Sequence, residues 1–364
     1  MKRKKKLLII LLSAAVVVVA GLAGFAAYGA QRLDALRGMS FNDMLTYTME
    51  NKKDAVITVG ILQNGEAQWT VYGENGAVLP QELRTYEIGS LTKTFTASLL
   101  AKAVSEGKVS LNDGIGRYLD LPEKDYYPTL RRLITHTSGY RAFYFEAPML
   151  TNFLYGGNDF YRITQSIVVE RLSKVDLENR DYPFLYSNFG FSTVGLVLQN
   201  VYGAEFRALM NAYIAEELGL KNTRLSTGSG EVENGWLWKD DDAYLPAGAL
   251  LSNIEDMLSY ARLQMEETPA YLALSHEALA RGTETSVQNE AMGIRVDAVG
   301  MGWMIDEENG IVWHNGGTSN YNSYLGFDAK RQVAVVILSN LPPDYKIPAT
   351  VMGIALLRQL QNAN

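Results

Sequence analysis

Strand-forming sequence lies near both ends of this chain, and the stretch between them, about residues 95–285, has a helical pattern. Near the N-terminal end, residues 55–78 alternate β-branched and aromatic side chains around Asn64-Gly65, which is a strong hairpin signal. Near the C-terminal end, residues 299–340 contain apolar runs separated by polar turns. Because strands bury their apolar faces by pairing and packing, the simplest arrangement joins the two sets in one antiparallel sheet.

The central stretch predicts a second lobe. Apolar residues recur there at helical intervals, and several helical segments end at glycine, which favours a left-handed cap. We therefore expect an α/β (α+β) fold. An antiparallel sheet from about residues 40–95 and 285–364, flanked by helices, would lie beside a mainly helical lobe of about residues 96–284. The cleft between the lobes is the expected ligand site.

The first thirty residues differ from the rest of the chain. Residues 2–6 are all Lys or Arg, and about residues 7–28 form an apolar run, close to the roughly 20 residues of a membrane-spanning helix. The run is longer than the apolar region of a typical signal peptide, about 7–15 residues. We predict that residues 1–30 are a cytoplasmic basic tail and signal anchor, and that residues 31–364 lie outside the cytoplasm. Secretion after cleavage and a buried core helix are the alternatives.

Charge and composition exclude several function classes. The net charge is −7, and because residues 2–6 contribute +5, the rest of the chain carries −12. Such an acidic body is a poor partner for nucleic acid. The chain has no cysteine, hence no disulfide and no thiolate nucleophile. Its three histidines, His136, His276 and His314, lie far apart without an H-E-x-x-H pattern, so we expect no metal site and no cofactor.

The segment YEIGSLTKTFTASLL, residues 86–100, places Ser90 at an expected helix start and Lys93 one turn later. Positions three apart share a helix face, so these side chains can be hydrogen-bonded. A serine becomes a good nucleophile when a base takes its proton, and lysine serves as that base if burial lowers its pKa. The alternative is that Ser90 is an N-cap. The S-x-x-K pattern alone is weak, because Ser105 and Lys108 also match it.

Tyr186-Ser187-Asn188 precedes an expected helix and is the second candidate element. A tyrosine beside a lysine can pass a proton, and an asparagine two residues later can hydrogen-bond a substrate amide through both its donor and its acceptor. In the alternative interpretation, Tyr186 packs against the helix start and Asn188 caps it.

His314-Asn315-Gly316-Gly317, at the end of an expected strand, is the third candidate element. Glycines let a backbone approach a ligand closely. The N–H of Gly317 could then join that of Ser90 in binding an oxyanion. A plain glycine turn between two strands is the alternative.

Together these elements resemble the serine β-lactamase-related family, which includes class C β-lactamases, D-alanyl-D-alanine carboxypeptidases, esterases and peptidases. The resemblance rests on residues 86–119, 130–140, 186–199 and 312–328, and it covers about residues 40–364. It implies a β-lactamase/penicillin-binding-protein-like fold and acyl-enzyme chemistry without metal or cofactor.

Carried over by position, the resemblance makes Ser90 the acylated nucleophile, Lys93 its proton acceptor and Tyr186 a proton shuttle. It assigns Asn188 to the substrate amide, and it assigns the second oxyanion N–H, beside that of Ser90, to Gly317.

His314 stands where many members of the family have the lysine of a K-T-G triplet, and with Gly316 it is assigned to substrate binding. A histidine near its reference pKa of about 6.5 is mostly neutral at pH 7 and holds a carboxylate weakly. This disfavours efficient β-lactamase activity. Arg358 in the closing helix is a candidate carboxylate contact, and His136 is expected to be structural.

The sequence therefore predicts a membrane-anchored serine hydrolase, D-alanyl-D-alanine carboxypeptidase-like, peptidase-like or esterase-like, acting on an amide or ester. The expected substrate is a small molecule or peptide, including peptidoglycan-derived peptides. A penicillin-binding-type sensor or surface binding protein, which acylates slowly or not at all, is the alternative.

Overall fold

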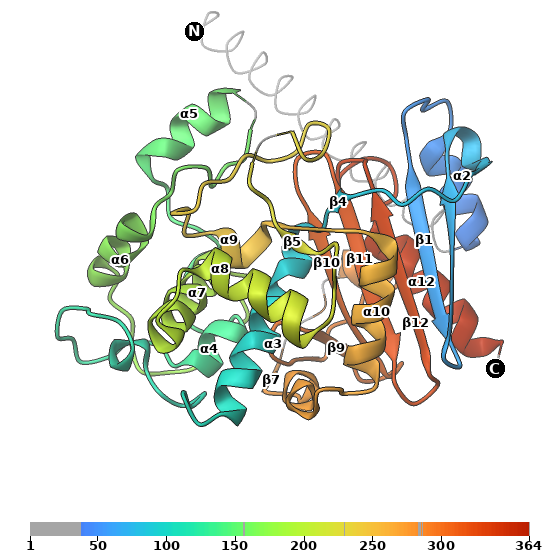
Figure 1. Cartoon of the computed structure of the whole chain (residues 1–364). Helices are drawn as coiled ribbons and strands as arrows, with labels where there is room; N and C mark the ends of the chain where they lie inside the picture. Colours follow the sequence, from blue (N-terminus) through green and yellow to red (C-terminus); the bar gives the residue numbers. More distant parts are fainter. Residues whose placement is uncertain (1–37, 156, 229, 283–284, 286, 364) are drawn as a thin grey trace, which may run out of the picture.

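The computed structural model describes residues 38–363 except 156, 229, 283–284 and 286 (Figure 1). The predicted anchor, residues 1–30, lies outside the described residues. Among the helices that are described, none has both the length and the apolar composition needed to cross a bilayer.

N-terminal and C-terminal strands share one sheet (Figure 1). Within the described residues, its nine strands, in spatial order, are β3 (Val78–Leu79), β2 (Glu66–Tyr72), β1 (Ile57–Gln63), β12 (Val333–Ser339), β11 (Asn322–Asp328), β10 (Ile311–Gly317), β9 (Met304–Asp306), β8 (Ala298–Val299) and β7 (Ala280–Arg281). Every pairing in this sheet is antiparallel. The predicted antiparallel sheet built from both ends of the chain is confirmed.

The predicted hairpin joins β1 to β2. Asn64 and Gly65 have φ of 51° and 83°, and Gln63 pairs with Glu66. Two successive left-handed residues are typical of a type I′ turn, whose twist matches that of the flanking strands. The predicted hairpin at Asn64-Gly65 is therefore confirmed.

Helices cover both faces of the sheet. On one face lie α2 (Phe41–Met49) and α12 (Ala349–Asn362), and on the other lies α10 (Ile254–Met265). Side chains of β12 alternate between these faces: Val335 and Ile337 belong to the apolar cluster on the α12 side, whereas Val336 and Leu338 belong to the cluster of the helical lobe. This two-residue period explains why β12 is a continuous apolar run.

The remaining helices form the lobe seen on the left of Figure 1. They are α3 (Thr92–Ser105), α4 (Leu130–Ile134), α5 (Ala147–Tyr155), α6 (Gln165–Lys174), α7 (Asn188–Tyr202), α8 (Phe206–Ala212) and α9 (Leu245–Gly248); the short α11 (Val287–Ala291) precedes β8. A small sheet of β4 (Tyr86–Glu87), β6 (Leu250–Ser252) and β5 (Arg224–Leu225) lies where the helical lobe meets the large sheet. This small sheet was not predicted.

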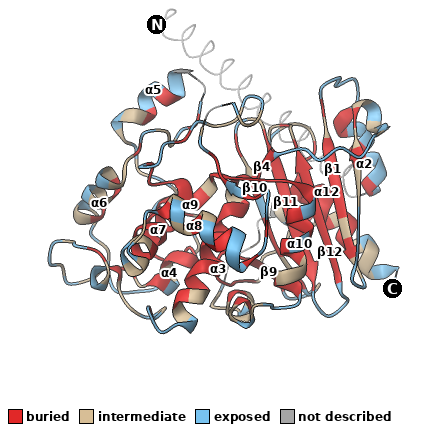
Figure 2. Cartoon of the chain, viewed as in Figure 1, coloured by how far each residue is buried: buried red, intermediate tan, exposed pale blue. Residues whose placement is uncertain are grey.

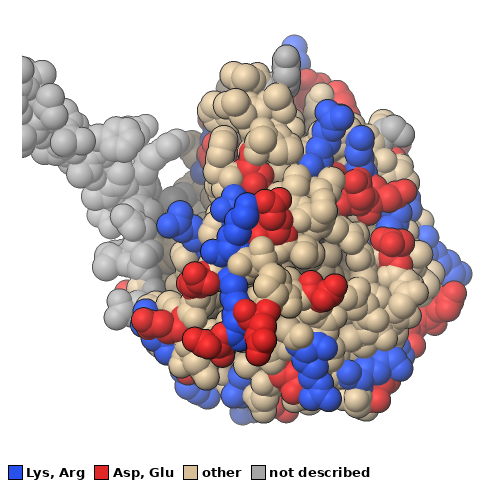
Figure 3. Space-filling model, turned by 90° about the vertical axis from the view of Figure 1, so that its left-hand side faces the viewer, with Lys and Arg blue, Asp and Glu red and all other residues tan. Residues whose placement is uncertain are grey.

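Helix α3 lies in the interior of the molecule. Figure 2 shows it buried along most of its length, like β11 and β12. On the face of the helical lobe that Figure 3 presents, Lys and Arg side chains are interspersed with Asp and Glu. The side chains at the start of α3, including Lys93, are by contrast buried.

Candidate active site

Ser90 lies in the 3₁₀ turn Gly89–Leu91 that leads into α3. Leu91, not Ser90, occupies the N-cap position of α3, and the Ser90 side chain makes no capping hydrogen bond. The N-cap interpretation of Ser90 is therefore wrong. The serine hydroxyl is free for other partners, which come from within α3 and from the segment before α7.

Lys93 is the first of these partners. Its side chain is fully buried, and its Nζ lies 3.0 Å from Ser90 Oγ and 2.7 Å from the carbonyl oxygen of Ala247 in α9. Burial lowers the pKa of Lys93 well below its ordinary value. A neutral amine can donate one hydrogen to the Ala247 carbonyl while its lone pair accepts the serine proton. This geometry suits a general base.

Tyr186 is the second partner. Lys93 Nζ lies 4.9 Å from the centroid of the Tyr186 ring. Desolvation raises the pKa of Tyr186, and a hydrogen bond with the Ser90 side chain offsets part of that increase. Burial thus favours the neutral form of both groups, which suits Lys93 to act as a base and Tyr186 to act as a proton donor. A base and an acid on one hydroxyl are what acyl transfer requires.

His136 supports Tyr186 from behind. Its Nδ1 accepts the backbone N–H of Ser187 at 3.0 Å, and its ring centroid lies 4.5 Å from that of Tyr186. Burial, with smaller contributions from Lys93 and His314, lowers the pKa of His136 well below its usual value. His136 therefore holds the segment that carries Tyr186 without contacting Ser90.

Asn188 is the first residue of α7 and lines the same cavity as Ser90. The cap of this helix is Ser187, whose Oγ accepts the N–H of Gly190 at 2.9 Å. The alternative in which Asn188 caps the helix is therefore wrong, and its amide side chain is available at the cavity.

Backbone contacts bring Gly317 to Ser90. A Cβ atom on Gly89, whose φ is 50°, would lie 2.6 Å from the nitrogen of Gly317, and one on Gly316 would lie 1.9 Å from the carbonyl oxygen of Ile88. Only glycine allows this approach of β10 to the serine turn. Ser90 and Gly317 consequently line one cavity, where both of their N–H groups can serve an oxyanion.

The cavity beside Ser90 has a volume of about 50 Å³ and aromatic walls. Its lining consists of Ser90, Asn188, Ala247, Gly248 and Gly317 together with Phe160, Trp236, Trp238 and Tyr244. The rings of Phe160 and Tyr244 stack with centroids 4.3 Å apart. These walls were not predicted from the sequence, although the alternating aromatic residues of Trp236-Leu237-Trp238 are a usable signal.

His314 lies on β10, fully buried, on the side of the sheet that faces Tyr186; their ring centroids are 6.2 Å apart. Its Nδ1 lies 2.6 Å from the carbonyl oxygen of Asn315, so Nδ1 carries the proton of the neutral ring. Burial, and secondarily the nearby Lys93, lowers the pKa of His314 to about 3. His314 therefore supplies no positive charge to the site at neutral pH.

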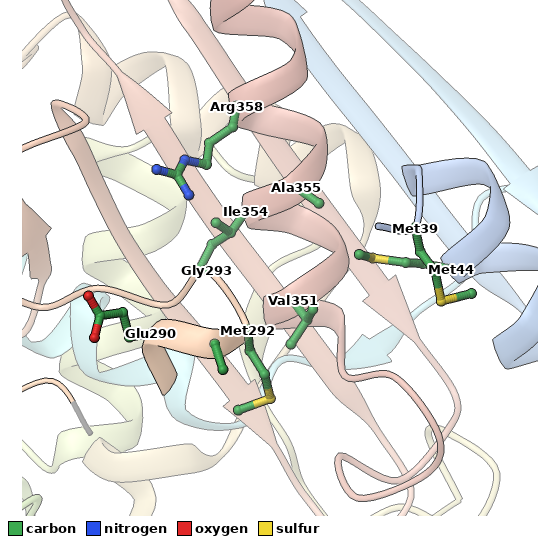
Figure 4. A pocket seen from close by; sticks show the side chains of 10 residues that line it. Met39, Met44, Glu290, Met292, Gly293, Val351, Ile354, Ala355 and Arg358 are labelled. Atoms are coloured by element: carbon green, nitrogen blue, oxygen red, sulfur yellow. The ribbon is translucent and has the colours of Figure 1, made fainter. Parts of the chain in front are cut away.

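Arg358 does not join this cluster. It extends from α12 into a separate cavity of about 270 Å³ on the opposite side of the sheet (Figure 4). Met39, Met44, Glu290 and Met292 are among its lining residues, and Arg358 Nη2 donates to Asn309 Oδ1 at 2.7 Å. The suggestion that Arg358 contacts a substrate carboxylate at Ser90 is wrong, because α12 covers the other face of the sheet.

The described part of the chain offers no group of three or more His, Cys, Asp or Glu side chains that could hold a metal ion.

A family model described as Beta-lactamase matches residues 41–352. The chain is 23% identical over 283 residues to "Protein flp" of Staphylococcus aureus (strain MW2), covering 71% of this chain and 53% of that protein, so the match spans about half of the relative. It is 25% identical over 342 residues to a "Beta-lactamase" of Pseudomonas fluorescens, covering 80% of this chain and 90% of the relative.

Two solved structures share the fold. The octameric penicillin-binding protein homologue from Pyrococcus abyssi aligns with a TM-score of 0.69 and 20% identity, covering 94% of this chain and 77% of the other. The Beta-lactamase/D-alanine Carboxypeptidase from Yersinia pestis, complexed with citrate, aligns with a TM-score of 0.68 and 17% identity, covering 87% and 95%. At these identities the likeness concerns the fold, and the predicted β-lactamase-like fold is confirmed.

Proposed function

The chain belongs to the Beta-lactamase family, and from this premise we propose that it is a serine hydrolase that cleaves an amide or ester through an acyl-enzyme on Ser90. The observation that carries the proposal is the 3.0 Å approach of Lys93 Nζ to Ser90 Oγ, combined with the burial that lowers the pKa of Lys93. A desolvated amine at hydrogen-bonding distance is the activation that a serine nucleophile needs.

Acylation begins when Ser90 Oγ attacks the substrate carbonyl carbon and its proton passes to Lys93 Nζ. The tetrahedral oxyanion is bound by the N–H groups of Ser90 and Gly317, each contributing about 3 kcal/mol to the transition state. As the bond to the leaving group breaks, the leaving group takes a proton from Tyr186. Lys93 then passes the proton that it received from Ser90 to Tyr186. Proton and charge are then balanced, and Ser90 carries the acyl group.

Deacylation repeats this chemistry with water. Lys93 removes a proton from the water as the water oxygen bonds to the acyl carbon, the same two N–H groups bind the resulting oxyanion, and Ser90 Oγ leaves with the proton that Lys93 accepted. The burial shared by Lys93 and Tyr186 supports this two-step exchange, since it lowers the pKa of Lys93 and raises the pKa of Tyr186.

The cavity favours a short, apolar acyl group. A volume of about 50 Å³ accommodates about four water-sized groups, such as the carbon atoms of a small acyl chain. Its walls are Phe160, Trp236, Trp238 and Tyr244. Because His314 is neutral and no Lys or Arg lines the described cavity, a substrate with a free carboxylate lacks a cationic partner there. We therefore favour esterase-like or neutral-amide hydrolysis over D-alanyl-D-alanine carboxypeptidase activity.

We also propose that residues 7–28 anchor this domain to a membrane, with the hydrolase domain extracytoplasmic. The support is the uninterrupted apolar run behind the basic residues 2–6. Carbonate extraction of membranes from cells that express the full chain tests this: the anchored protein stays in the pellet, and a variant lacking residues 2–28 does not.

The decisive experiment measures the intact mass of the protein after exposure to short and long p-nitrophenyl esters, a D-alanyl-D-alanine peptide, a penicillin and a chromogenic cephalosporin. We expect an acetyl adduct on the wild type and none on Ser90→Ala. Ser105→Ala is the matched control, because Ser105 is the other S-x-x-K serine and its hydroxyl donates to the carbonyl of Lys102, away from the Ser90 cavity. An unchanged adduct on Ser90→Ala would refute the mechanism.

One observation favours the slowly acylating sensor as a second candidate: the cavity is far smaller than the roughly 300–1,000 Å³ of most ligand pockets. A sensor would give a stoichiometric Ser90 adduct that persists, with product release limited to one equivalent. A hydrolase would lose the adduct and release product continuously.

A further inference from the structure

Glu87 is a buried carboxylate that the proposed mechanism does not use. It lies on β4, three residues before Ser90, and its side chain is 3% exposed. Its Oε1 accepts the backbone N–H of Trp236 at 2.5 Å, and its Oε2 accepts the hydroxyl of Thr318 at 2.6 Å. The two oxygens thus bind two segments that are distant in sequence.

These segments form two sides of the catalytic cavity. Trp236 is part of the aromatic wall, and Thr318 directly follows Gly317, the candidate oxyanion donor. Cross-links between the aromatic loop and the turn after β10 supplement the carboxylate: Trp236 Nε1 donates to Ser319 Oγ at 2.8 Å, and Asn320 Nδ2 donates to the carbonyl of Asn234 at 2.8 Å. Glu87 is the buried connection between this aromatic loop and the turn after β10.

Burying the Glu87 carboxylate is unfavourable for folding, and a contribution to stability alone does not explain why a carboxylate occupies this position. Among the described residues, no Lys, Arg or His forms an ion pair with it or offsets its charge, and burial raises its pKa more than its two hydrogen bonds lower it. Desolvating a carboxylate without a cation is unfavourable. Tyr321 is the titratable neighbour on the turn, and its phenol donates to the carbonyl of Glu233. Groups retained at such a cost occur most often at functional sites.

We propose that Glu87 is a positioning residue that holds the aromatic wall at Trp236 and the oxyanion strand at Gly317 at one fixed spacing from Ser90, and thereby sets the preference for short acyl groups. The inference rests on the proposed hydrolase function. It goes beyond that function by making one carboxylate responsible for both transition-state geometry and acyl-chain selectivity.

The physical reason is the precision that an oxyanion site requires. Displacement of a donor by about 1 Å can cost about 10²-fold in rate. Without the carboxylate, the Thr318 hydroxyl and the Trp236 N–H lose their shared acceptor, so the turn and the loop can separate. Separation moves the Gly317 N–H away from the oxyanion and widens the cavity.

The test compares acylation rates of acetyl and octanoyl p-nitrophenyl esters for Glu87→Ala, Glu87→Gln and Thr318→Val. Glutamine keeps both connections, because its oxygen accepts from Trp236 and its amide group donates to Thr318 Oγ1. We expect Glu87→Ala to lower the acetyl rate about 10²-fold and to reduce the acetyl-to-octanoyl ratio at least tenfold. Glu87→Gln should stay within about threefold of wild type, and Thr318→Val should lose about tenfold on acetyl.

Asp256→Ala is the matched control. The Asp256 carboxylate is also buried and likewise accepts one backbone N–H, from Asn222 at 2.7 Å, and one threonine hydroxyl, from Thr223 at 2.9 Å. It lies on α10, outside the cavity lining. Asp256→Ala should lower the melting temperature without changing the acetyl-to-octanoyl ratio.

Two results would overturn the inference: a wild-type ratio in Glu87→Ala, or equal damage in Glu87→Gln and Glu87→Ala. If Glu87→Ala does not fold, Glu87→Gln and Thr318→Val decide, and wild-type kinetics in Thr318→Val rejects the proposal. If the wild type itself forms no acyl adduct, the proposed function fails instead, so the two failures are distinguishable.

Discussion

The two faces of the nine-stranded sheet each border a cavity, and the two cavities differ in size and chemistry. On the α12 face, the cavity of about 270 Å³ contains methionines and the charged groups of Glu290 and Arg358. On the helical-lobe face, the cavity of about 50 Å³ contains Ser90 and aromatic rings. The smaller cavity is the one beside a lysine whose pKa is strongly lowered.

Cavity volume therefore does not mark the candidate active site. Burial around Ser90 shifts the pKa of Lys93 down and that of Tyr186 up, so a base and an acid coexist at one hydroxyl. On the α12 face, Arg358 is held by a hydrogen bond to Asn309. If the chemistry is confined to the helical-lobe face, substitutions there should change the acylation rate, and substitutions on the α12 face should not.

Replacing the buried amine should have the largest effect. Lys93→Ala should lower the acylation rate about 10³-fold, because Ser90 loses its base. The pKa of Lys93 is lowered, so the neutral, active amine persists at pH values far below 10.5, and wild-type acylation falls only as pH drops through that lowered pKa. Stopped-flow ester acylation across pH should show this acid limb in the wild type and not in Lys93→Ala.

Lys102→Ala is the control for that variant, because Lys102 lies on the same helix and pairs at the surface with Glu106 and Glu217. It should retain the wild-type rate and acid limb. If Lys93→Ala acylates at the wild-type rate, Lys93 is not the base, and the proposed difference between the two faces of the sheet is contradicted.

Distorting the oxyanion geometry should have the next largest effect. Gly89→Ala places a Cβ 2.6 Å from the Gly317 nitrogen at a φ of 50°, so the two N–H donors must move apart. We expect about a 10²-fold loss in acylation and a loss of about 1–2 kcal/mol in stability. Gly107→Ala, at a φ of 69° with open space around it, should share the stability cost and keep the rate. If the two variants acylate at equal rates, the close approach of Gly89 to Gly317 is not required for catalysis.

Removing the Arg358 side chain from the α12 cavity should leave the acylation rate unchanged. Arg358→Ala deletes the hydrogen bond to Asn309 and should cost about 1 kcal/mol in urea unfolding. Its acylation rate should remain within about twofold of wild type, since α12 packs in the apolar cluster on one side of the sheet, whereas Ile88 and Leu91 beside Ser90 pack in the cluster of the helical lobe. A tenfold rate loss would show that the larger cavity participates in the reaction.

The smallest expected change is in the protonation of His314. Its pKa is lowered to about 3, so its NMR signals should not titrate between pH 5 and 8 in the native protein. In urea-unfolded protein the same residue should titrate near its reference pKa of about 6.5. A native titration in that range would mean that a cation is available to bind substrate carboxylates, and it would revive the carboxypeptidase interpretation.

Local sequence predicted local structure well. Asn64-Gly65 specified its turn because only certain residues adopt successive left-handed conformations at low cost. The helix ending near Gly203, whose φ is 65°, follows the same logic. The small sheet of β4, β5 and β6 was missed because strands of two or three residues leave almost no periodic signal.

The candidate site was predictable in part. The spacing of Ser90 and Lys93 and the Tyr186-to-Asn188 segment pointed to side chains that the fold brings together. Arg358 was misplaced because sequence does not tell which face of a sheet a closing helix covers. Glu87 and the aromatic walls were overlooked because their partners, such as Thr318 for Glu87, are far away in the chain.

By itself, the sequence determined what backbone periodicity controls: strands at both ends, a helical middle, and a serine and a lysine one turn apart. Tertiary structure alone decided how strongly Lys93 is desolvated, that the carbonyl of Ala247 holds its amine, and that β10 brings Gly317 against the serine turn. The physical reason is range: dihedral preferences act between neighbours, whereas desolvation sums over atoms that only the folded chain brings together.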